Sequence, residues 1–283
     1  MTEILKGKPV ADAVKADVAD RALKLKEKGI LPLLMILRAG EREDDIAYEK
    51  RVIKNCGEVH IDVKTAVFPQ DVSHDVFLRA LRGFSEDSAV HGILVLRPLP
   101  EQIGDGEAGS AVNPRKDIDC MNPENLRKIF TGDTSAVAPC TPEAVIETLK
   151  FYGYEIRGKN VTIVNRSLVL GKPLSMLFLN EHATVTVCHS RSENLPEITS
   201  KADILVAGVG RPKYFGREYV SSDMTVIDVG INFTEEGMCG DMDFDEVRDI
   251  VSAITPVPGG IGTVTSAILL RHLVESAELS IKG

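Results

Sequence analysis

The residues best suited to bind an anion lie in one polar turn, from Asn165 to Gly171, between a predicted strand and a predicted helix. In α/β proteins such a turn binds phosphates because the free N–H groups and the dipole of the helix N-terminus face the ligand. Arg166 and Ser167 add a cation and a hydroxyl. Asn165 stands where a glycine of the usual fingerprint is expected. The turn predicts a site for an anionic ligand, with an ordinary strand–helix loop as the alternative.

A second strand is expected at 184–188, roughly twenty residues after the turn. In an NAD site this strand often ends in a carboxylate that accepts a hydrogen bond from the ribose 2′-OH. Here Ser190 and Arg191 follow it, and no carboxylate is present to repel a 2′-phosphate. Together with Arg166, these groups favour NADP over NAD. His189 is a candidate catalytic base, although a loop histidine near a ribose more often serves packing or hydrogen bonding.

Composition excludes several classes of protein. The chain has 283 residues, enough for two domains at about 150 residues each. Its 43% hydrophobic and 27% charged content is typical of a soluble globular protein. The net charge of −9 argues against nucleic-acid or anionic-membrane binding. Five scattered cysteines without a CxxC motif predict reduced thiols, no metal site and a cytoplasmic location, and neither a secretion signal nor a transmembrane run is expected.

The elements that must position these residues alternate between helix and strand, which predicts parallel sheets with right-handed crossovers. Helices are expected at 8–28, 45–57, 74–84, 172–180, 193–199 (or a turn there) and 264–280. Strands are expected at 32–37, 60–66, 92–96, 161–164, 184–188, 203–207, 224–229 and 250–255.

Two proline-marked segments predict where the chain passes between domains. The first is Pro139–Pro142, where Thr141 is expected to cap the following helix with Pro142 at its first position. The second is Thr255–Gly260, after which the last helix is expected to return to the first domain. The predicted domains are therefore 1–140, completed by 264–283, and 141–263.

Several segments together resemble the methylenetetrahydrofolate dehydrogenase/cyclohydrolase family, and the resemblance covers essentially the whole chain. The segments that carry it are Gly92–Val95 with Pro98–Pro100, Lys116–Asp119, Pro139–Pro142, Arg166–Ser167 with Gly171–Pro173, Val187–Ser190, Asp228–Asn232, Gly240–Asp241 and Pro256–Gly260. The resemblance implies an α/β folate-binding domain, a Rossmann-like NADP-binding domain, a cleft between them and a homodimer. It also implies oxidation of 5,10-methylenetetrahydrofolate to 5,10-methenyltetrahydrofolate and, in many members, hydrolysis of that product to 10-formyltetrahydrofolate.

The resemblance assigns roles to individual residues. Tyr48 resembles the family tyrosine that stacks near the pterin and aminobenzoate, and Asp119 resembles the carboxylate that binds the pterin; both are expected at the catalytic centre. Pro258, Gly259 and Gly260 are expected to let backbone approach the substrate closely. The expected cofactor-binding residues are Asn165, Arg166, Ser167, Ser190, Arg191 and Ile231.

Two departures from the family pattern concern the hydrolytic step. In the family, a lysine essential for hydrolysis follows the helix tyrosine by four residues, one turn along the same face, and here the position is Val52. The glutamine that partners the lysine is replaced by Leu96. Lys54 lies two residues beyond Val52, roughly 200° round the helix. Arg97 is also new, and it either contacts folate, replaces the lost charge or is simply solvated.

These departures leave three hypotheses. The first is an NADP-dependent methylenetetrahydrofolate dehydrogenase with weak or absent cyclohydrolase activity. The second is a bifunctional enzyme in which Lys54, Lys50 or Arg51 supplies the missing cation. The third is a non-catalytic folate- or nucleotide-binding regulatory subunit, against which the retained cofactor residues argue.

Overall fold

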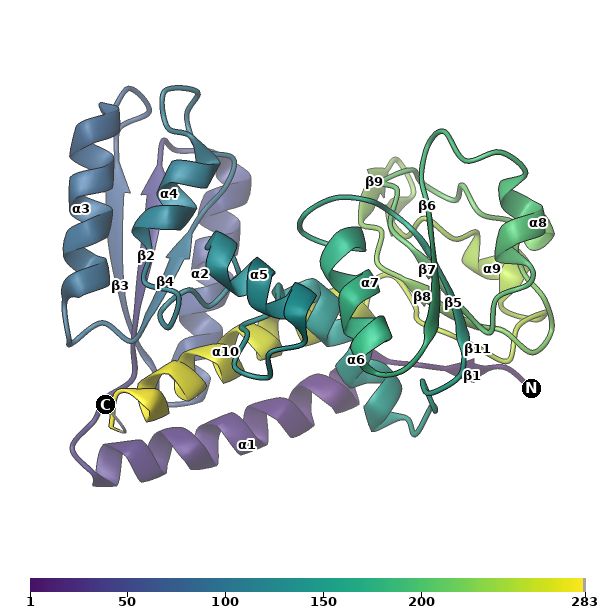
Figure 1. Cartoon of the computed structure of the whole chain (residues 1–283), viewed down its shortest axis with the longest axis horizontal. Helices are drawn as coiled ribbons and strands as arrows, with labels where there is room; N and C mark the ends of the chain where they lie inside the picture. The colour runs from purple at the N-terminus through teal and green to yellow at the C-terminus, as the bar shows by residue number, and fades with distance from the viewer. Residues whose placement is uncertain (282–283) are drawn as a thin grey trace. The chain divides into compact units, whose positions relative to one another are not determined.

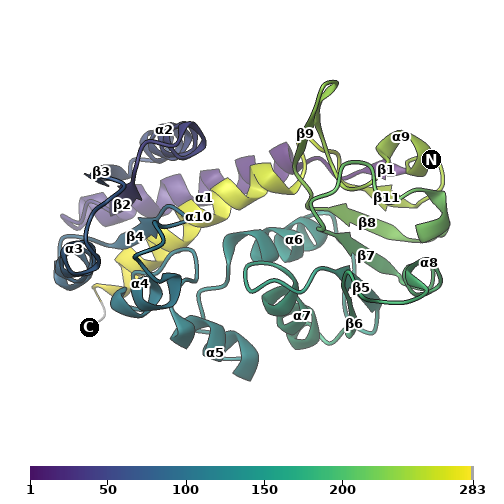
Figure 2. The same cartoon turned by 90° about the horizontal axis from the view of Figure 1, so that it is seen from above.

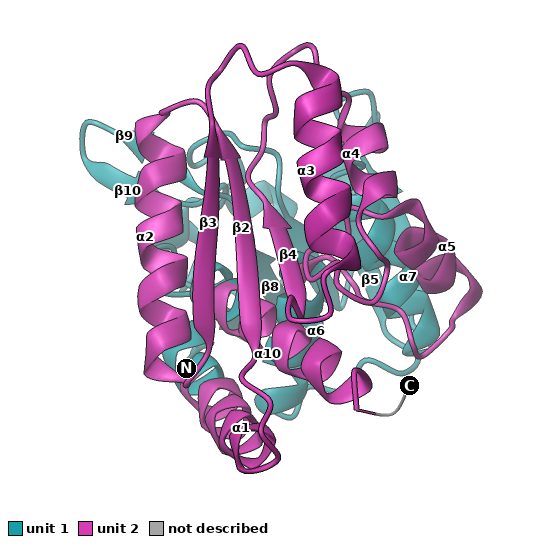
Figure 3. Ribbon diagram, turned by 90° about the vertical axis from the view of Figure 1, so that its left-hand side faces the viewer, with its two compact units in different colours: residues 1–11, 141–265 teal, residues 12–140, 266–283 magenta. Residues whose placement is uncertain are grey.

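The computed structural model describes residues 1–281, which form two compact units of α and β structure (Figure 3). Unit 1 comprises residues 1–11 and 141–265, and unit 2 comprises residues 12–140 and 266–281. The predicted α/β class is confirmed, because each unit is built on a parallel sheet with helices around it.

Unit 1 contains a six-stranded parallel sheet in the order β1-β11-β8-β7-β5-β6 (Figure 2). Its strands are β1 (Glu3–Ile4), β5 (Asn160–Val164), β6 (Thr184–Cys188), β7 (Ile204–Ala207), β8 (Thr225–Asp228) and β11 (Ala253–Ile254). Around it lie α6 (Cys140–Phe151), α7 (Gly171–Asn180), α8 (Leu195–Thr199), the 3-10 turn η1 (Arg217–Tyr219) and α9 (Phe244–Val247), with a hairpin of β9 (Asn232–Thr234) and β10 (Gly237–Cys239). The central strands β7 and β8 are fully buried, so they form the core of the unit.

Unit 2 is built on a three-stranded parallel sheet in the order β3-β2-β4 (Figure 3). Its elements are β2 (Leu33–Ala39), α2 (Glu43–Glu58), β3 (Asp62–Phe68), α3 (His74–Glu86), β4 (Gly92–Val95), α4 (Asp105–Ala111) and α5 (Pro123–Thr131), with most of α1 (Gly7–Glu27) and α10 (Ile261–Leu279). The central strand β2 is buried throughout and packs with Phe77, Leu78 and Leu81 of α3.

Helices α1 and α10 run side by side in unit 2 (Figure 1, Figure 2). Arg21 of α1 donates to both carboxylate oxygens of Glu278 on α10, at 2.9 and 2.8 Å. Helix α10 also packs directly on β4: a Cβ added to Gly92 would stand 2.3 Å from the Leu273 side chain. The terminal helix therefore completes the unit that contains β4.

Some predicted boundaries differ from the structure. The predicted first domain began at residue 1, whereas β1 pairs in parallel with β11 and places residues 1–11 in unit 1. Helix α6 begins at Cys140, so Thr141 lies in its first turn and is not its cap. Pro142 is tolerated there because the first four N–H groups of a helix have no partner within the helix.

The strand predicted at 250–255 is shorter than expected. Only Ala253–Ile254 forms β11, because α9 and a turn occupy the residues before it. Helices α4 and α5 and the hairpin of β9 and β10 were not predicted.

Candidate active site

The ends of β5 and β6 bring the two predicted cofactor segments together in unit 1. Val164 pairs with Cys188 in a parallel ladder, so Arg166 and Arg191 follow neighbouring strands at the same edge of the sheet. Both arginines and Ser190 are exposed. Within residues 1–281 neither arginine has a carboxylate within ion-pair distance, so both guanidinium groups are available to an anion. Two cations and a hydroxyl are exposed on the loops that follow these two strands, and their contact with the 2′-phosphate of NADP stays a prediction.

The predicted phosphate turn is organised by Asn165. Its Oδ1 accepts hydrogen bonds from the N–H of Ser167 at 2.8 Å, the hydroxyl of Ser167 at 2.8 Å and the N–H of Gly171 at 2.9 Å. Its Nδ2 donates to the carbonyl of Gly208 at the end of β7. A Cβ at Gly171 would lie 1.9 Å from the Asn165 carbonyl oxygen, so the start of α7 needs glycine there. Asn165 and Ser167 shape the turn, and their contact with a cofactor stays a prediction.

His189 has a structural role in the neighbouring loop. Its backbone N–H donates to Ser192 Oγ at 2.9 Å, and its Nδ1 accepts from the backbone N–H of Arg191 at 3.1 Å. The ring therefore fixes the backbone of Arg191, in keeping with the hydrogen-bonding alternative to a catalytic base.

A buried pair of aspartates, which the sequence had not singled out for chemistry, holds the loops after β7 and β8. Asp241 accepts from the backbone N–H groups of Val209, Gly210 and Arg211. Asp228 accepts from those of Gly230, Asp241 and Met242. Burial and the charge of Asp241 raise the pKa of Asp228 to about 7, against the opposing effect of its three N–H donors. The pair fixes the sheet edge next to the cofactor segments.

The other residues predicted to touch ligand in unit 1 lie after β8 and β11. Ile231 is exposed, so its side chain is accessible, and its contact with a cofactor stays a prediction. Pro258 and Gly259 are exposed and Gly260 is buried. A Cβ on Gly7 would lie 2.1 Å from the Gly260 carbonyl oxygen. The backbone of Gly260 therefore packs closely against the first residue of α1. Contact of these three residues with substrate is untested and stays a prediction.

In unit 2 the structure brings Tyr48 and Asp119 into one cluster. Tyr48 lies on α2 with its ring half-buried, and the guanidinium carbon of Arg51 lies 5.3 Å from the ring centre. Burial first, and then the negative charge of Asp119, raise the pKa of the Tyr48 hydroxyl, so it stays protonated at neutral pH. A neutral tyrosine beside a carboxylate is able to stack on an aromatic ring and donate a hydrogen bond.

Three residues that the predicted site did not include surround Asp119. Arg97 lies with Nη2 3.5 Å from Asp119 Oδ2. The thiol of Cys140 hydrogen-bonds to the Asp119 side chain, and its sulfur lies 3.3 Å from the Ile118 carbonyl oxygen. His272 of α10 bonds the same carbonyl through Nδ1 at 2.9 Å. Cys140 lies in Pro139–Pro142, a segment that predicted a domain crossing and carried part of the family resemblance but was given no chemical role.

Asp117 and Asp119 have separate duties. Asp117 is buried, and its carboxylate accepts from the backbone N–H groups of Met121 and Asn122 and from Asn125 Nδ2. It fixes the turn that leads into α5. Asp119 is about one-third exposed and is the carboxylate of the two that a ligand can reach.

The two departures from the family pattern lie in buried positions. The side chains of Val52 on α2 and Leu96 after β4 are in the apolar core, with Val52 3% and Leu96 5% exposed. Lys54 points elsewhere on α2 and is exposed. The positions at which the resemblance implied a lysine and a glutamine are therefore occupied by apolar, buried side chains.

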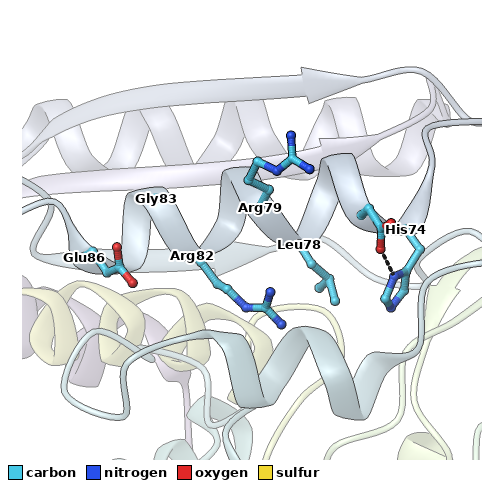
Figure 4. A pocket seen from close by; sticks show the side chains of 7 residues that line it. His74, Leu78, Arg79, Arg82, Gly83 and Glu86 are labelled. Carbon is cyan, nitrogen blue, oxygen red and sulfur yellow. Dashed lines mark hydrogen bonds and ion pairs between the residues drawn. The ribbon is translucent and has the colours of Figure 1, made fainter.

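A surface hollow of about 500 Å³ on α3 is lined by none of these residues (Figure 4). It is lined by His74, Asp75, Leu78, Arg79, Arg82, Gly83 and Glu86, none of which was predicted to do chemistry. Among the residues that the structure describes, no cluster of three His, Cys, Asp or Glu side chains is placed to hold a metal ion. No helix within the same residues is long and apolar enough to cross a membrane.

Fold and site together define a two-unit α/β protein with a dinucleotide-binding sheet and a separate cluster of Tyr48 and Asp119. The profile of the tetrahydrofolate dehydrogenase/cyclohydrolase catalytic domain matches residues 5–119, and that of the NAD(P)-binding domain of the same enzymes matches residues 139–281. The chain belongs to the tetrahydrofolate dehydrogenase/cyclohydrolase family.

Individual relatives are similar over their whole length. The bifunctional protein FolD of Clostridium botulinum (strain Okra / Type B1) is 49% identical over 98% of this chain and 99% of that protein. The crystal structure of a bifunctional FolD from Campylobacter jejuni superposes with a TM-score of 0.97 at 34% identity, covering 99% of both chains. A Trypanosoma brucei FolD, solved in complex with NADP cofactor and inhibitor, gives a TM-score of 0.93 at 31% identity and covers 100% of this chain and 99% of that one.

Proposed function

We propose that this protein oxidises 5,10-methylenetetrahydrofolate to 5,10-methenyltetrahydrofolate with NADP and has weak or absent cyclohydrolase activity. Family membership supports the dehydrogenase. The single observation that carries the second part is the burial of Val52 and Leu96, two apolar side chains at the positions of the family's lysine and glutamine.

Bound NADP would supply the hydride acceptor. Arg166, Ser190 and Arg191 would hold its 2′-phosphate, and the N-terminus of α7 would face the pyrophosphate. Asp119 would accept paired hydrogen bonds from the amino and ring N–H groups of the pterin, and Tyr48 would stack on the substrate. Dehydrogenation requires the protein mainly to position the substrate against the cofactor and to provide a suitable electrostatic environment. These residues would serve both purposes.

The hydrolytic step has a further requirement. Attack of water on the methenyl carbon needs a polar group to orient the water and manage its protons. Val52 and Leu96 offer no donor or acceptor. The presence of apolar side chains at both positions is also expected from the stability of the folded protein, because a single buried polar group without its partner would lower the free energy of unfolding. The residues present therefore support dehydrogenation without efficient hydrolysis.

A product assay tests this proposal. We expect purified protein, given methylenetetrahydrofolate and NADP, to accumulate methenyltetrahydrofolate. Methenyltetrahydrofolate added alone should decay no faster than in buffer. NADP should also give a higher kcat/KM than NAD, since each charge-assisted contact to the 2′-phosphate contributes about 1.5–3 kcal/mol. Hydrolysis at a rate comparable to oxidation would contradict the loss of cyclohydrolase, and equal use of NAD would contradict the assignment of the two arginines.

The converse test restores the missing groups. Val52→Lys with Leu96→Gln should create measurable hydrolysis if the rest of the site is intact. Val52→Lys alone should instead lower the free energy of unfolding by roughly 3–5 kcal/mol, because it buries a charge without its partner. Lys54→Ala serves as the matched control, because removing an exposed lysine from the same helix should change neither hydrolysis nor stability.

A bifunctional dehydrogenase/cyclohydrolase is the second candidate. The relatives from C. botulinum and C. jejuni are both named as bifunctional enzymes, which favours it. In that case Lys54, Lys50 or Arg51 of α2 would supply the cation, and Lys54→Ala would abolish hydrolysis. A non-catalytic binding subunit is the third, and formation of any NADPH from methylenetetrahydrofolate would exclude it.

We also propose a homodimer formed through unit 1. Strand β6 is an edge strand of the sheet, so the backbone groups on its outer side have no partner strand in the described chain. Val187 on this strand and Leu179 at the end of α7 are 40% and 54% exposed. An unprotected edge with apolar neighbours is suited to pairing with a second copy.

A further inference from the structure

Arg97 is placed by the sheet of unit 2. Leu96 continues β4 and donates its N–H to the Leu37 carbonyl at 2.9 Å, with its side chain in the core. The segment before Asp119 runs beside β4, because Ile93 bridges Asp117 and donates to the Lys116 carbonyl at 2.8 Å. Arg97 and Asp119 therefore lie close together, just beyond the point at which the two paired backbone segments diverge.

The contact between these two side chains is specific. Their side chains are 30% and 32% exposed, and Nη2 and Oδ2 lie 3.5 Å apart. Within residues 1–281, Asp119 is the only carboxylate within ion-pair distance of Arg97. A partly buried ion pair is screened less by solvent than one on the open surface, so the contact affects the charge state of the acid.

The other groups around Asp119 come from four segments. They are Tyr48 of α2, Asp117 of its own loop, Cys140 of α6 and His272 of α10. Burial is the largest effect and leaves the pKa of Asp119 above its usual value, and Asp117 adds to the rise, whereas Arg97, the Cys140 thiol and His272 oppose it. Arg97 is the permanently charged member of this set, because a guanidinium does not deprotonate in proteins.

We propose that Arg97 is a positioning residue for folate turnover, whose guanidinium keeps the Asp119 carboxylate ionised and fixed in orientation. The inference rests on the proposed role of Asp119 as the acceptor for the pterin. It gives a role to the new arginine: a cation of this cluster lies next to the Asp119 carboxylate, whereas Val52 carries no charge. A protonated Asp119 would lose one of its two acceptor positions for the paired hydrogen bonds.

Steady-state kinetics test the proposal. Arg97→Leu should raise the KM for methylenetetrahydrofolate about three- to tenfold and change kcat by less than about twofold, because a ground-state contact is weakened. Arg97→Lys should recover most of the loss, since it keeps a point charge. Arg82→Leu, which removes an exposed arginine on α3, is the matched control and should behave as wild type. A loss in Arg97→Leu that Arg97→Lys does not recover would overturn the charge argument.

The pH profile gives a readout that a merely structural role would not move. Asp119 must be ionised to act, so kcat/KM falls as the pH drops through its pKa. Loss of Arg97 raises that pKa, and the acid limb of the profile should move to higher pH in Arg97→Leu. An acid limb unchanged from wild type would overturn the proposal.

A double-mutant cycle identifies the group through which Arg97 acts. Tetrahydrofolate affinity, measured by fluorescence titration, should fall in Arg97→Leu but not fall further when this change is made in Asp119→Asn. An equal loss in both backgrounds would mean that Arg97 touches the substrate itself, which contradicts the proposal. The proposed function is judged separately, by whether wild-type protein forms NADPH, and the binding cycle is interpretable either way.

Discussion

At the scale of single residues, the structure separates carboxylates that fold the chain from one that faces a ligand. Asp117, Asp228 and Asp241 each accept several hydrogen bonds from N–H groups of the protein itself. Asp119 instead is bonded by a thiol and paired with a guanidinium, and part of its surface is open. A carboxylate whose acceptor sites are not all used by the protein is free to bind a ligand.

We expect Asp119→Asn and Asp119→Ala to impair folate turnover by at least about tenfold, since two charge-assisted hydrogen bonds are lost. NADP affinity, measured by titration, should stay within about twofold of wild type, because the predicted cofactor residues lie in unit 1. Asp117→Ala is the informative contrast: it should lower stability by several kcal/mol through loss of a buried network. A loss of NADP affinity in the Asp119 variants as severe as the loss of turnover would contradict the division of roles.

Asp228 predicts a pH dependence of stability. Its pKa of about 7 lies above the unfolded value near 4, so the folded state holds the proton more tightly. Its contribution is therefore favourable below the unfolded pKa and is lost as the pH rises through about 7. Asp228→Asn should gain roughly 2–4 kcal/mol relative to wild type as the pH rises from about 4 to 8.

Urea unfolding at a series of pH values measures this difference between the two proteins. Asp223→Asn, which changes an exposed carboxylate of the same unit, is the control and should show no such trend. A constant difference between Asp228→Asn and wild type would show that burial does not hold the proton on Asp228.

At the scale of elements, the cofactor turn depends on one amide side chain. Asn165 replaces the backbone flexibility of a glycine-rich loop with hydrogen bonds that connect the turn to α7 and to the end of β7. Gly171 remains because the first residue of α7 touches the Asn165 backbone. The turn therefore keeps a fixed shape with fewer glycines than the usual fingerprint.

We expect Asn165→Ala to lower the free energy of unfolding by about 1–3 kcal/mol and NADP affinity by about tenfold, because the turn loses its shared acceptor. Thermal unfolding and cofactor titration measure the two effects. Asn160→Ala is the matched control, since Asn160 lies at the opposite end of β5 and its side chain hydrogen-bonds to Asp203. Equal losses of NADP affinity in both variants would contradict a local role for Asn165.

At the scale of the whole molecule, the edge strand β6 predicts the oligomeric state. Light scattering during size-exclusion chromatography should give twice the chain mass of 30.8 kDa. Val187→Glu should favour the monomer, because a charge on an edge strand opposes pairing. Phe233→Glu changes another exposed apolar residue, on β9, and should leave the dimer intact. A wild-type monomer would rule out the proposed dimer.

Much of the fold followed from local pattern. The alternation of apolar strands and helices predicted both sheets, and most elements lie within one to three residues of their predicted bounds. Helix α5 was missed although Asn122, Pro123 and Gly132 mark its start and end. Helix α4 contains two glycines, which lower its intrinsic helix propensity and leave its formation to packing against α3.

The sequence by itself determined the family resemblance, the cations predicted to bind the cofactor and the apolar residue types of Val52 and Leu96, because these depend on residue type and order along the chain. Only the tertiary structure decided that Arg97 faces Asp119, that Asp228 and Asp241 hold one sheet edge and that β1 belongs to unit 1. The pairings of Arg97 with Asp119 and of β1 with β11 join residues that are distant in the chain. The motifs that contain Asp228 and Asp241 do not indicate which backbone N–H groups these carboxylates bind. Such contacts depend on sheet register and helix packing, which local periodicity does not specify.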